Sequence, residues 1–263
     1  MKLGNVWAVF LFEWRRTLTA SRLMWLAVLT LFPVFICTLI RLSNSHPIPH
    51  DPWAVFLFVL VPMVTAMLGT FLWSTPAVSA EIERGSWTYV AVRPGGRTAL
   101  ILGKYLAAVT WVLPAALVSL TASAWIAPAV GGFDTWRVIA QLTCLAVPAY
   151  AAVYLVLGTL FTKRSMVIAV AYTLIFELGV SMVPAIINKL TVQYRLRALL
   201  IDWAHIQVSQ EQNGVLDTIR SLLGDAAAWW HVSVLVVYTL VCLVAAVVLV
   251  RTREYGLAKA SEV

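Results

Sequence analysis

Six long apolar runs, separated by polar stretches, account for most of this chain. Each run is near or above the roughly 20 apolar residues that an α-helix needs to cross a bilayer. The runs lie at Leu23–Leu42, Pro52–Ser79, Tyr105–Ala129, Val138–Phe161, Met166–Ile187 and Trp229–Val250. We therefore predict an all-α polytopic membrane protein with six transmembrane helices, folded as a single transmembrane domain over residues 1–263.

The first 22 residues are amphipathic and not uniformly apolar. The apolar positions recur at helical spacing, at Trp7, Phe10, Leu11, Trp14 and Leu18, and the polar positions opposite them are Asn5, Glu13, Arg16 and Thr17. With several Lys and Arg nearby, this pattern predicts a helix that lies in the membrane interface over residues 1–22. The alternative is the start of a tilted first span, but the charges at Glu13, Arg15 and Arg16 argue against it.

Two connecting segments are longer than a turn requires. The first, Glu81–Lys104, carries two Glu and four Lys or Arg, and it predicts a polar surface segment over residues 80–104. The second runs from Asn188 to about Ala228, and its apolar residues are spaced as in two short amphipathic helices broken near Asn213-Gly214. It predicts a small helical extracytoplasmic cap between spans 5 and 6, over residues 188–228.

The composition agrees with a membrane protein and the charge distribution orients it. The chain is 61% hydrophobic and 12% charged, whereas soluble domains carry about 25% charged residues. Thirteen of the 19 Lys and Arg residues fall at the two ends and in the second and fourth loops, and six fall in the opposite set. The positive-inside rule therefore places both termini in the cytoplasm. The net charge is +7, and the basic residues lie between the apolar runs. Anionic membrane lipids therefore explain the charge better than nucleic acid does, and no nucleic-acid partner is expected.

Glu177 is an acidic residue deep in an apolar run, about eleven residues into the fifth predicted span. A carboxylate at that depth is costly, and such residues commonly face a cavity or a partner. Glu177 is therefore a candidate for a substrate pathway or a gate. A structural hydrogen bond between helices explains it at least as well, and both interpretations stay open.

No motif for catalysis, metal binding or nucleotide binding stands out. The three Cys have no metal-ligand spacing, the four His lie outside the spans or at their edges, and neither H-E-x-x-H nor G-x-S-x-G occurs. Gly103-Lys104 resembles the end of a P-loop, but Tyr105 replaces the required Ser or Thr. We expect no catalytic residues, no metal site and no cofactor bound by this chain, which is then not an enzyme. If the protein is driven by ATP, another polypeptide supplies the ATPase.

A sequence signature after the second span resembles that of the ABC-2 type transporter permeases, the membrane subunits of type-2 ABC exporters. The family shows an acidic residue, a Glu–basic–Gly–Thr/Ser step, a Pro and a Gly-Lys that opens the third span. Here these stand as Glu81, Glu83-Arg84-Gly85-Ser86, Pro94 and Gly103-Lys104. Ser86 stands where Thr is commoner and keeps the hydroxyl. With the interfacial helix, six spans and the long loop between spans 5 and 6, the resemblance covers nearly the whole chain.

The resemblance implies an exporter permease of the plasma membrane, the inner membrane of a bacterium. It implies two cytoplasmic ABC ATPase subunits, which bind ATP and Mg, and a second permease chain that forms a homodimer or heterodimer with this one. The ATPase-coupling residues would be Glu81, Glu83, Arg84, Gly85 and Ser86. We expect an exposed helix on which Glu81, Glu83 and Arg84 dock by charge complementarity, while Gly85-Ser86 sets or caps a helix end.

Three alternatives remain beside the exporter. One is a proton-coupled secondary transporter in which Glu177 titrates. Another is a membrane assembly or sensor subunit that binds an ATPase and moves nothing. The third is a membrane-embedded enzyme acting on lipids, which would need a polar catalytic cluster near one interface that the loops do not show.

Overall fold

The computed structural model describes residues 3–43, 49–127, 132–180, 188–189, 191–206 and 227–255. Every regular element in these residues is a helix. In chain order they are α1 (Leu3–Thr17), α2 (Ala20–Ser43), α3 (His50–Phe58), the π-helix η1 (Val59–Ala66), α4 (Met67–Ser74), the 3-10 turn η2 (Thr75–Ala77), α5 (Ser79–Glu83), α6 (Trp87–Val92), α7 (Gly96–Ile126), α8 (Gly132–Leu160), α9 (Ser165–Tyr172), the π-helix η3 (Thr173–Gly179), α10 (Val192–Trp203) and α12 (Ala228–Thr252).

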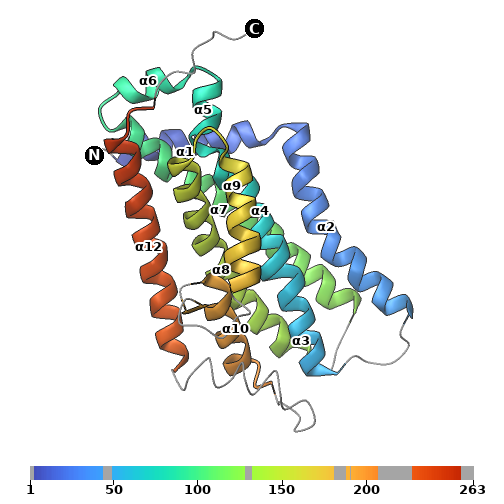
Figure 1. Ribbon diagram of the computed structural model, residues 1–263. Helices are drawn as coiled ribbons and strands as arrows, with labels where there is room; N and C mark the ends of the chain where they lie inside the picture. The colour runs from blue at the N-terminus through green and yellow to red at the C-terminus, as the bar shows by residue number, and fades with distance from the viewer. Residues whose placement is uncertain are drawn as a thin grey trace.

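Five helices in the described residues are long and apolar enough to cross a membrane. They are α2, the continuous stretch α3–η1–α4–η2 (His50–Ala77), α7, α8 and α12. They correspond to five of the six runs predicted from the sequence, and they make this a multi-pass membrane protein. Figure 1 shows these long helices side by side, with α5 and α6 beyond one end of the bundle.

The fifth predicted span, Met166–Ile187, is not confirmed as one continuous helix. Helical residues run from Ser165 to Gly179, which at 1.5 Å per residue is roughly 22 Å, less than the roughly 30 Å of a hydrocarbon core. Residues 181–187 lie outside the described residues. The chain nevertheless goes from one end of the bundle toward the other here. Ser165 contacts Ser79, the first residue of α5, and Arg195 of α10 contacts His231 near the start of α12.

Helix α10 completes that passage and belongs to the bundle. It is the first of the two short helices predicted for the extracytoplasmic segment 188–228, and the second falls in residues 207–226, outside the described residues. It packs against α8 and α12 with Leu196 and Leu199 fully buried. Apolar side chains therefore hold α10 against the helix bundle, and the helical cap predicted over residues 188–228 is not confirmed.

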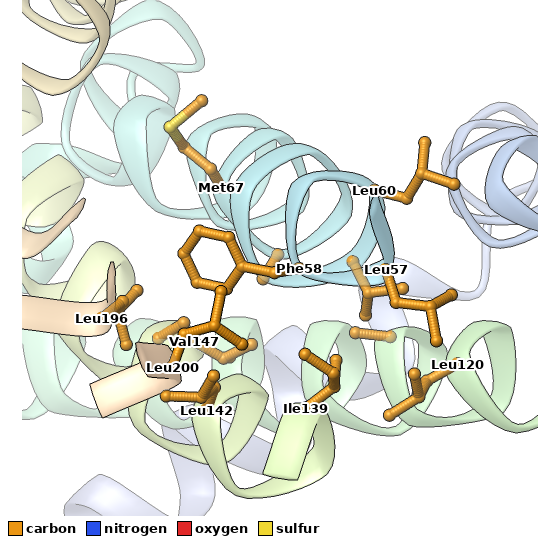
Figure 2. Close-up of a cluster of buried hydrophobic side chains, with 14 of the residues drawn as sticks. Leu57, Phe58, Leu60, Met67, Leu120, Ile139, Leu142, Val147, Leu196 and Leu200 are labelled. Carbon is orange, nitrogen blue, oxygen red and sulfur yellow. The ribbon is translucent and has the colours of Figure 1, made fainter. Parts of the chain in front are cut away.

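Helix α8 is the most enclosed of the long helices, and α2 and α12 are the least. Figure 2 shows Leu142 and Ile139 of α8 packed toward Leu57 and Phe58 of α3, with side chains of α10 on the same side. Gly158 on α8 lies so close to η2 that an added Cβ would stand 2.1 Å from the Thr75 carbonyl oxygen. The exposed apolar faces of α2 and α12 are the surfaces that lipid or another membrane chain would cover.

Helix α1 is separate from the first span, as the amphipathic pattern predicted, and Figure 1 shows it lying crosswise at the end of the bundle. Its predicted apolar face is largely open, with Trp7 59% and Leu11 39% exposed. Its opposite face packs on α7, where Gly103 admits Val9 so closely that an added Cβ would meet its side chain at 2.6 Å. Val6 and Glu13 are buried on this inward face, while Asn5 stays exposed, so of the predicted polar positions Glu13 is the one turned into the protein.

Candidate functional site

The surface segment predicted at residues 80–104 folds as two short helices followed by the start of α7. Pro76 has non-helical backbone angles, so the long second span breaks there before α5 begins at Ser79. Gly85 has φ +70°, a conformation that glycine adopts without steric cost, and it ends α5 directly before α6. A second left-handed residue, Gly95 at φ +73°, precedes α7. These breaks place a compact helical turn beyond the end of the spans (Figure 1).

The five residues predicted for ATPase coupling divide into an exposed group and a buried one. Glu83, Arg84 and Gly85 are exposed and Ser86 is half-buried. Glu81, however, is only 4% exposed, so the expectation that it shares an exposed docking surface with Glu83 and Arg84 is wrong. The reason is that Glu81 points from α5 toward the buried ammonium group of Lys104, which the sequence did not identify as its partner.

Lys104 and Glu81 form a buried ion pair at the end of the bundle. The Lys104 Nζ donates to Glu81 Oε1 at 2.7 Å and to the Ala77 carbonyl oxygen at 2.7 Å. It also lies 3.7 Å from Glu13 Oε1 on α1. Lys104 is 6% exposed and Glu13 5%, so these charges compensate one another away from water.

Arg16 and Ser86 extend the pair into a network across four helices. The Arg16 Nη1 donates to Glu81 Oε1 at 3.1 Å and lies 3.2 Å from Glu13 Oε1. The Ser86 hydroxyl, at the start of α6, donates to Glu81 Oε2 and to the Glu81 carbonyl oxygen. Glu81 thereby joins α5 to α1, α6 and α7 through one carboxylate.

The electrostatics of Glu81 reflect that dense set of donors. Burial raises the pKa of its carboxyl group, but the positive charge of Lys104, the hydrogen bonds from Lys104 and Ser86 and the charge of Arg16 together lower the pKa from 4.5 to about 2. The carboxylate is therefore ionised throughout the physiological range. A cavity of about 20 Å³ remains beside the network, which is room for about one water molecule.

Glu177 occupies a second buried polar site, where the short helices η3 and α10 meet. It is fully buried, and its Oε2 accepts the backbone N–H of Gln193 at 3.0 Å while its Oε1 accepts that of Val192 at 3.4 Å. The Tyr172 hydroxyl donates to Oε1 at 3.0 Å, and the positive charge of Arg197 also acts on the carboxylate. Glu177 thus satisfies the first N–H groups of α10, as a capping residue does, from a different helix.

The sequence did not reveal the partners that complete either site. The amphipathic pattern predicts Glu13 and Arg16 on the polar side of an interfacial helix, and Lys104 is one of the basic residues that orient the chain. One feature of the sequence does allow the pairing. Glu81 follows the second apolar run and Lys104 stands at the start of the third, so both lie at the same membrane face. For Glu177 two of the partners are the backbone N–H groups of Val192 and Gln193, which leave no residue signature.

No protein-family model matches the chain, and no curated protein matches it. Within the described residues, no group of three or more His, Cys, Asp or Glu side chains is placed to hold a metal ion.

Replacing one partner of the buried pair should destabilise the protein more than replacing both. Glu81→Leu leaves the Lys104 ammonium buried without its nearest carboxylate, so we expect a loss of about 3–5 kcal/mol in the free energy of unfolding. Adding Lys104→Met removes the orphaned charge, and we expect it to recover part of that loss. Thermal unfolding in detergent, with the exposed Glu83→Leu as control, measures both effects. A double variant that is less stable than Glu81→Leu alone would contradict the pairing. So would a loss of stability in Glu81→Leu no larger than that in Glu83→Leu.

Removing the Glu177 carboxylate should loosen the start of α10. Glu177→Leu leaves two backbone N–H groups without their acceptor, which costs about 1–3 kcal/mol for each buried group. We expect faster hydrogen exchange at Val192 and Gln193, with a smaller effect in Glu177→Gln, which keeps one acceptor oxygen. Asp202→Asn, at an exposed position at the other end of α10, is the control. Unchanged exchange in Glu177→Leu would show that the carboxylate does not hold α10.

Proposed function

We propose that this chain is the permease subunit of an ATP-driven ABC exporter of the plasma membrane. It pairs with a second permease chain to form the substrate pathway and couples to two separate ATPase subunits through the Glu81–Lys104 segment. ATP and Mg bind to those ATPase subunits. Both termini of this chain then face the cytoplasm, on the side of the membrane where α5 and α6 lie.

The observation that carries the proposal is the combination of an exposed helical turn and a buried charge network directly beneath it. Glu83 and Arg84 present opposite charges to solvent at the tip of α5, which suits docking by charge complementarity. Two residues before Glu83, Glu81 ties the same helix to Lys104 and Arg16. A partner that pushes on α5 therefore pushes on α1 and α7 as well.

The network suits the transmission of a rigid-body motion. Helix α5 follows the second span with one break at Pro76, and Lys104 sits near the start of the third. The pair Glu81–Lys104 thus joins the ends of two successive spans, and Arg16 adds the crosswise helix α1. A displacement imposed at Glu83 and Arg84 would move these helices together, which is how domain rocking converts a local push into a change at distance.

The proton-coupled alternative has less support from the geometry of Glu177. Its two oxygen atoms accept hydrogen bonds from Val192, Gln193 and Tyr172, and none of its surface is open to solvent. A carboxylate that titrates during transport needs access to protons at some stage. The contacts favour a positioning role for Glu177, in which it seats α10 against α8 and α12.

The proposal predicts that charge reversal on α5 uncouples an ATPase from this chain. Tagged protein is purified in mild detergent from its native cell, and ATPase activity is measured in the eluate. We expect an ATPase to co-purify with the wild type and to be lost, or to lose substrate-stimulated activity, with Glu83→Lys/Arg84→Glu. Both side chains are exposed, so the variant should keep the fold and thermal stability of the wild type.

The matched control is Lys163→Glu/Glu254→Lys, a second exchange of opposite charges at exposed positions of the same end of the bundle. It should retain the ATPase. Absence of any ATPase with the wild type in several detergents, or an equal loss in both double variants, would refute coupling through α5. A transport assay in proteoliposomes with the co-purified ATPase then separates an exporter from a subunit that binds an ATPase and moves nothing.

A further inference from the structure

An open cavity lies where α1, the α6–α7 connection and the end of α12 meet. Its volume is about 920 Å³, and among the described residues its lining includes Arg93, Arg97 and Arg251 but no acidic residue. Three guanidinium-bearing residues around one hollow create a strongly positive surface. Neither the buried charge network nor the coupling surface at Glu83 and Arg84 uses these arginines.

The cavity is preorganised for an anion. Arg97 donates to the carbonyl oxygens of Arg251 at 3.2 Å and Arg253 at 3.4 Å, and its guanidinium stands 5.8 Å from the Trp87 ring centroid. The 31-residue helix α7 begins here after Gly95 with no side-chain cap and no acidic residue in its first turn. The positive end of its dipole adds to the field of the arginines.

An apolar stripe leads from this cavity along the membrane-spanning part of α12. Val237, Val241, Val244 and Val248 are spaced by four, three and four residues and are 50–62% exposed, and Arg251 continues the same face one turn later. Successive residues at these intervals lie on one side of a helix. The cavity therefore has basic side chains at the membrane surface, next to the exposed valine stripe on the membrane-spanning part of α12.

We propose that this cavity binds an anionic phospholipid, with the phosphate among Arg93, Arg97 and Arg251 and an acyl chain along the valine stripe of α12. Charge complementarity accounts for the headgroup, since Arg pairs readily with phosphate oxygens. The stripe is the reason for choosing a lipid over an acidic segment of a protein, because it extends into the region that lipid occupies. Val92, beside the arginines, is 79% exposed and adds apolar surface at the same level.

Lipid titration followed by native mass spectrometry of the intact protein tests this site. The probes are phosphatidylglycerol and phosphatidylcholine with identical acyl chains, and soluble glycerol phosphate. We expect the wild type to bind phosphatidylglycerol more tightly than phosphatidylcholine, and added salt to weaken that binding. In Arg93→Gln/Arg251→Gln we expect binding of phosphatidylglycerol to be about 10- to 30-fold weaker, since each basic side chain near an anionic membrane surface contributes about fivefold to the affinity. Arg97 is left in place because it bonds to the end of α12.

The control is Lys163→Gln/Arg164→Gln, which removes the same charge from exposed positions at the same end of the bundle, and it should bind phosphatidylglycerol as the wild type does. Equal affinities in all three proteins would overturn the site. So would glycerol phosphate binding as tightly as the lipid, which would indicate a site for free anions. Unchanged lipid affinity in Arg93→Gln/Arg251→Gln, together with loss of a co-purifying ATPase, would overturn it in favour of an acidic protein surface.

Discussion

The ion pair between Glu81 and Lys104 fixes the end of the bundle on which the surface helices stand. A lysine and a glutamate this deeply buried are stable only if each compensates the other's charge, and their oxygen and nitrogen atoms lie 2.7 Å apart. Arg16 and Glu13 join them from α1, so a helix that would otherwise rest on the membrane surface is bound to the spans. These ion pairs add directional contacts among α1, α5 and α7 to the apolar packing of α1 on α7.

The second polar site solves a different problem. The fifth passage through the bundle is made by short helices, and a helix that starts inside the protein has N–H groups without partners. Glu177 supplies the acceptor for the start of α10, and Thr191 supplies a conventional cap at Tyr194. The position of a carboxylate within an apolar run is thus explained by its hydrogen bonds to the start of α10, because backbone groups at membrane depth need polar partners from the surrounding protein.

Hydropathy and helical periodicity predict the parts of this fold that depend on one segment at a time. They give five of the long helices and the separate amphipathic α1, because the length and apolar content of each segment suffice. They do not show that Glu81 is buried, since that depends on Lys104 and Arg16 coming from other helices. They also predict the fifth run, Met166–Ile187, as one regular helix because it is apolar throughout, whereas Thr173–Gly179 is a π-helix. The burial of Glu81 depends on contacts between distant segments, which the pattern of a single segment does not show.

The most direct measurement is the ionisation of Glu81 itself, followed by NMR of ¹³C-labelled glutamate side chains with Glu81→Gln to assign the signal. The pKa is lowered in the folded protein, so the pair stabilises the fold above the ordinary pKa of 4.5 and loses its effect as the pH falls through about 2. We therefore expect the Glu81 signal to remain that of a carboxylate at pH 3.5. A midpoint for Glu81 at or above 4.5 would contradict the buried pair and the coupling built on it.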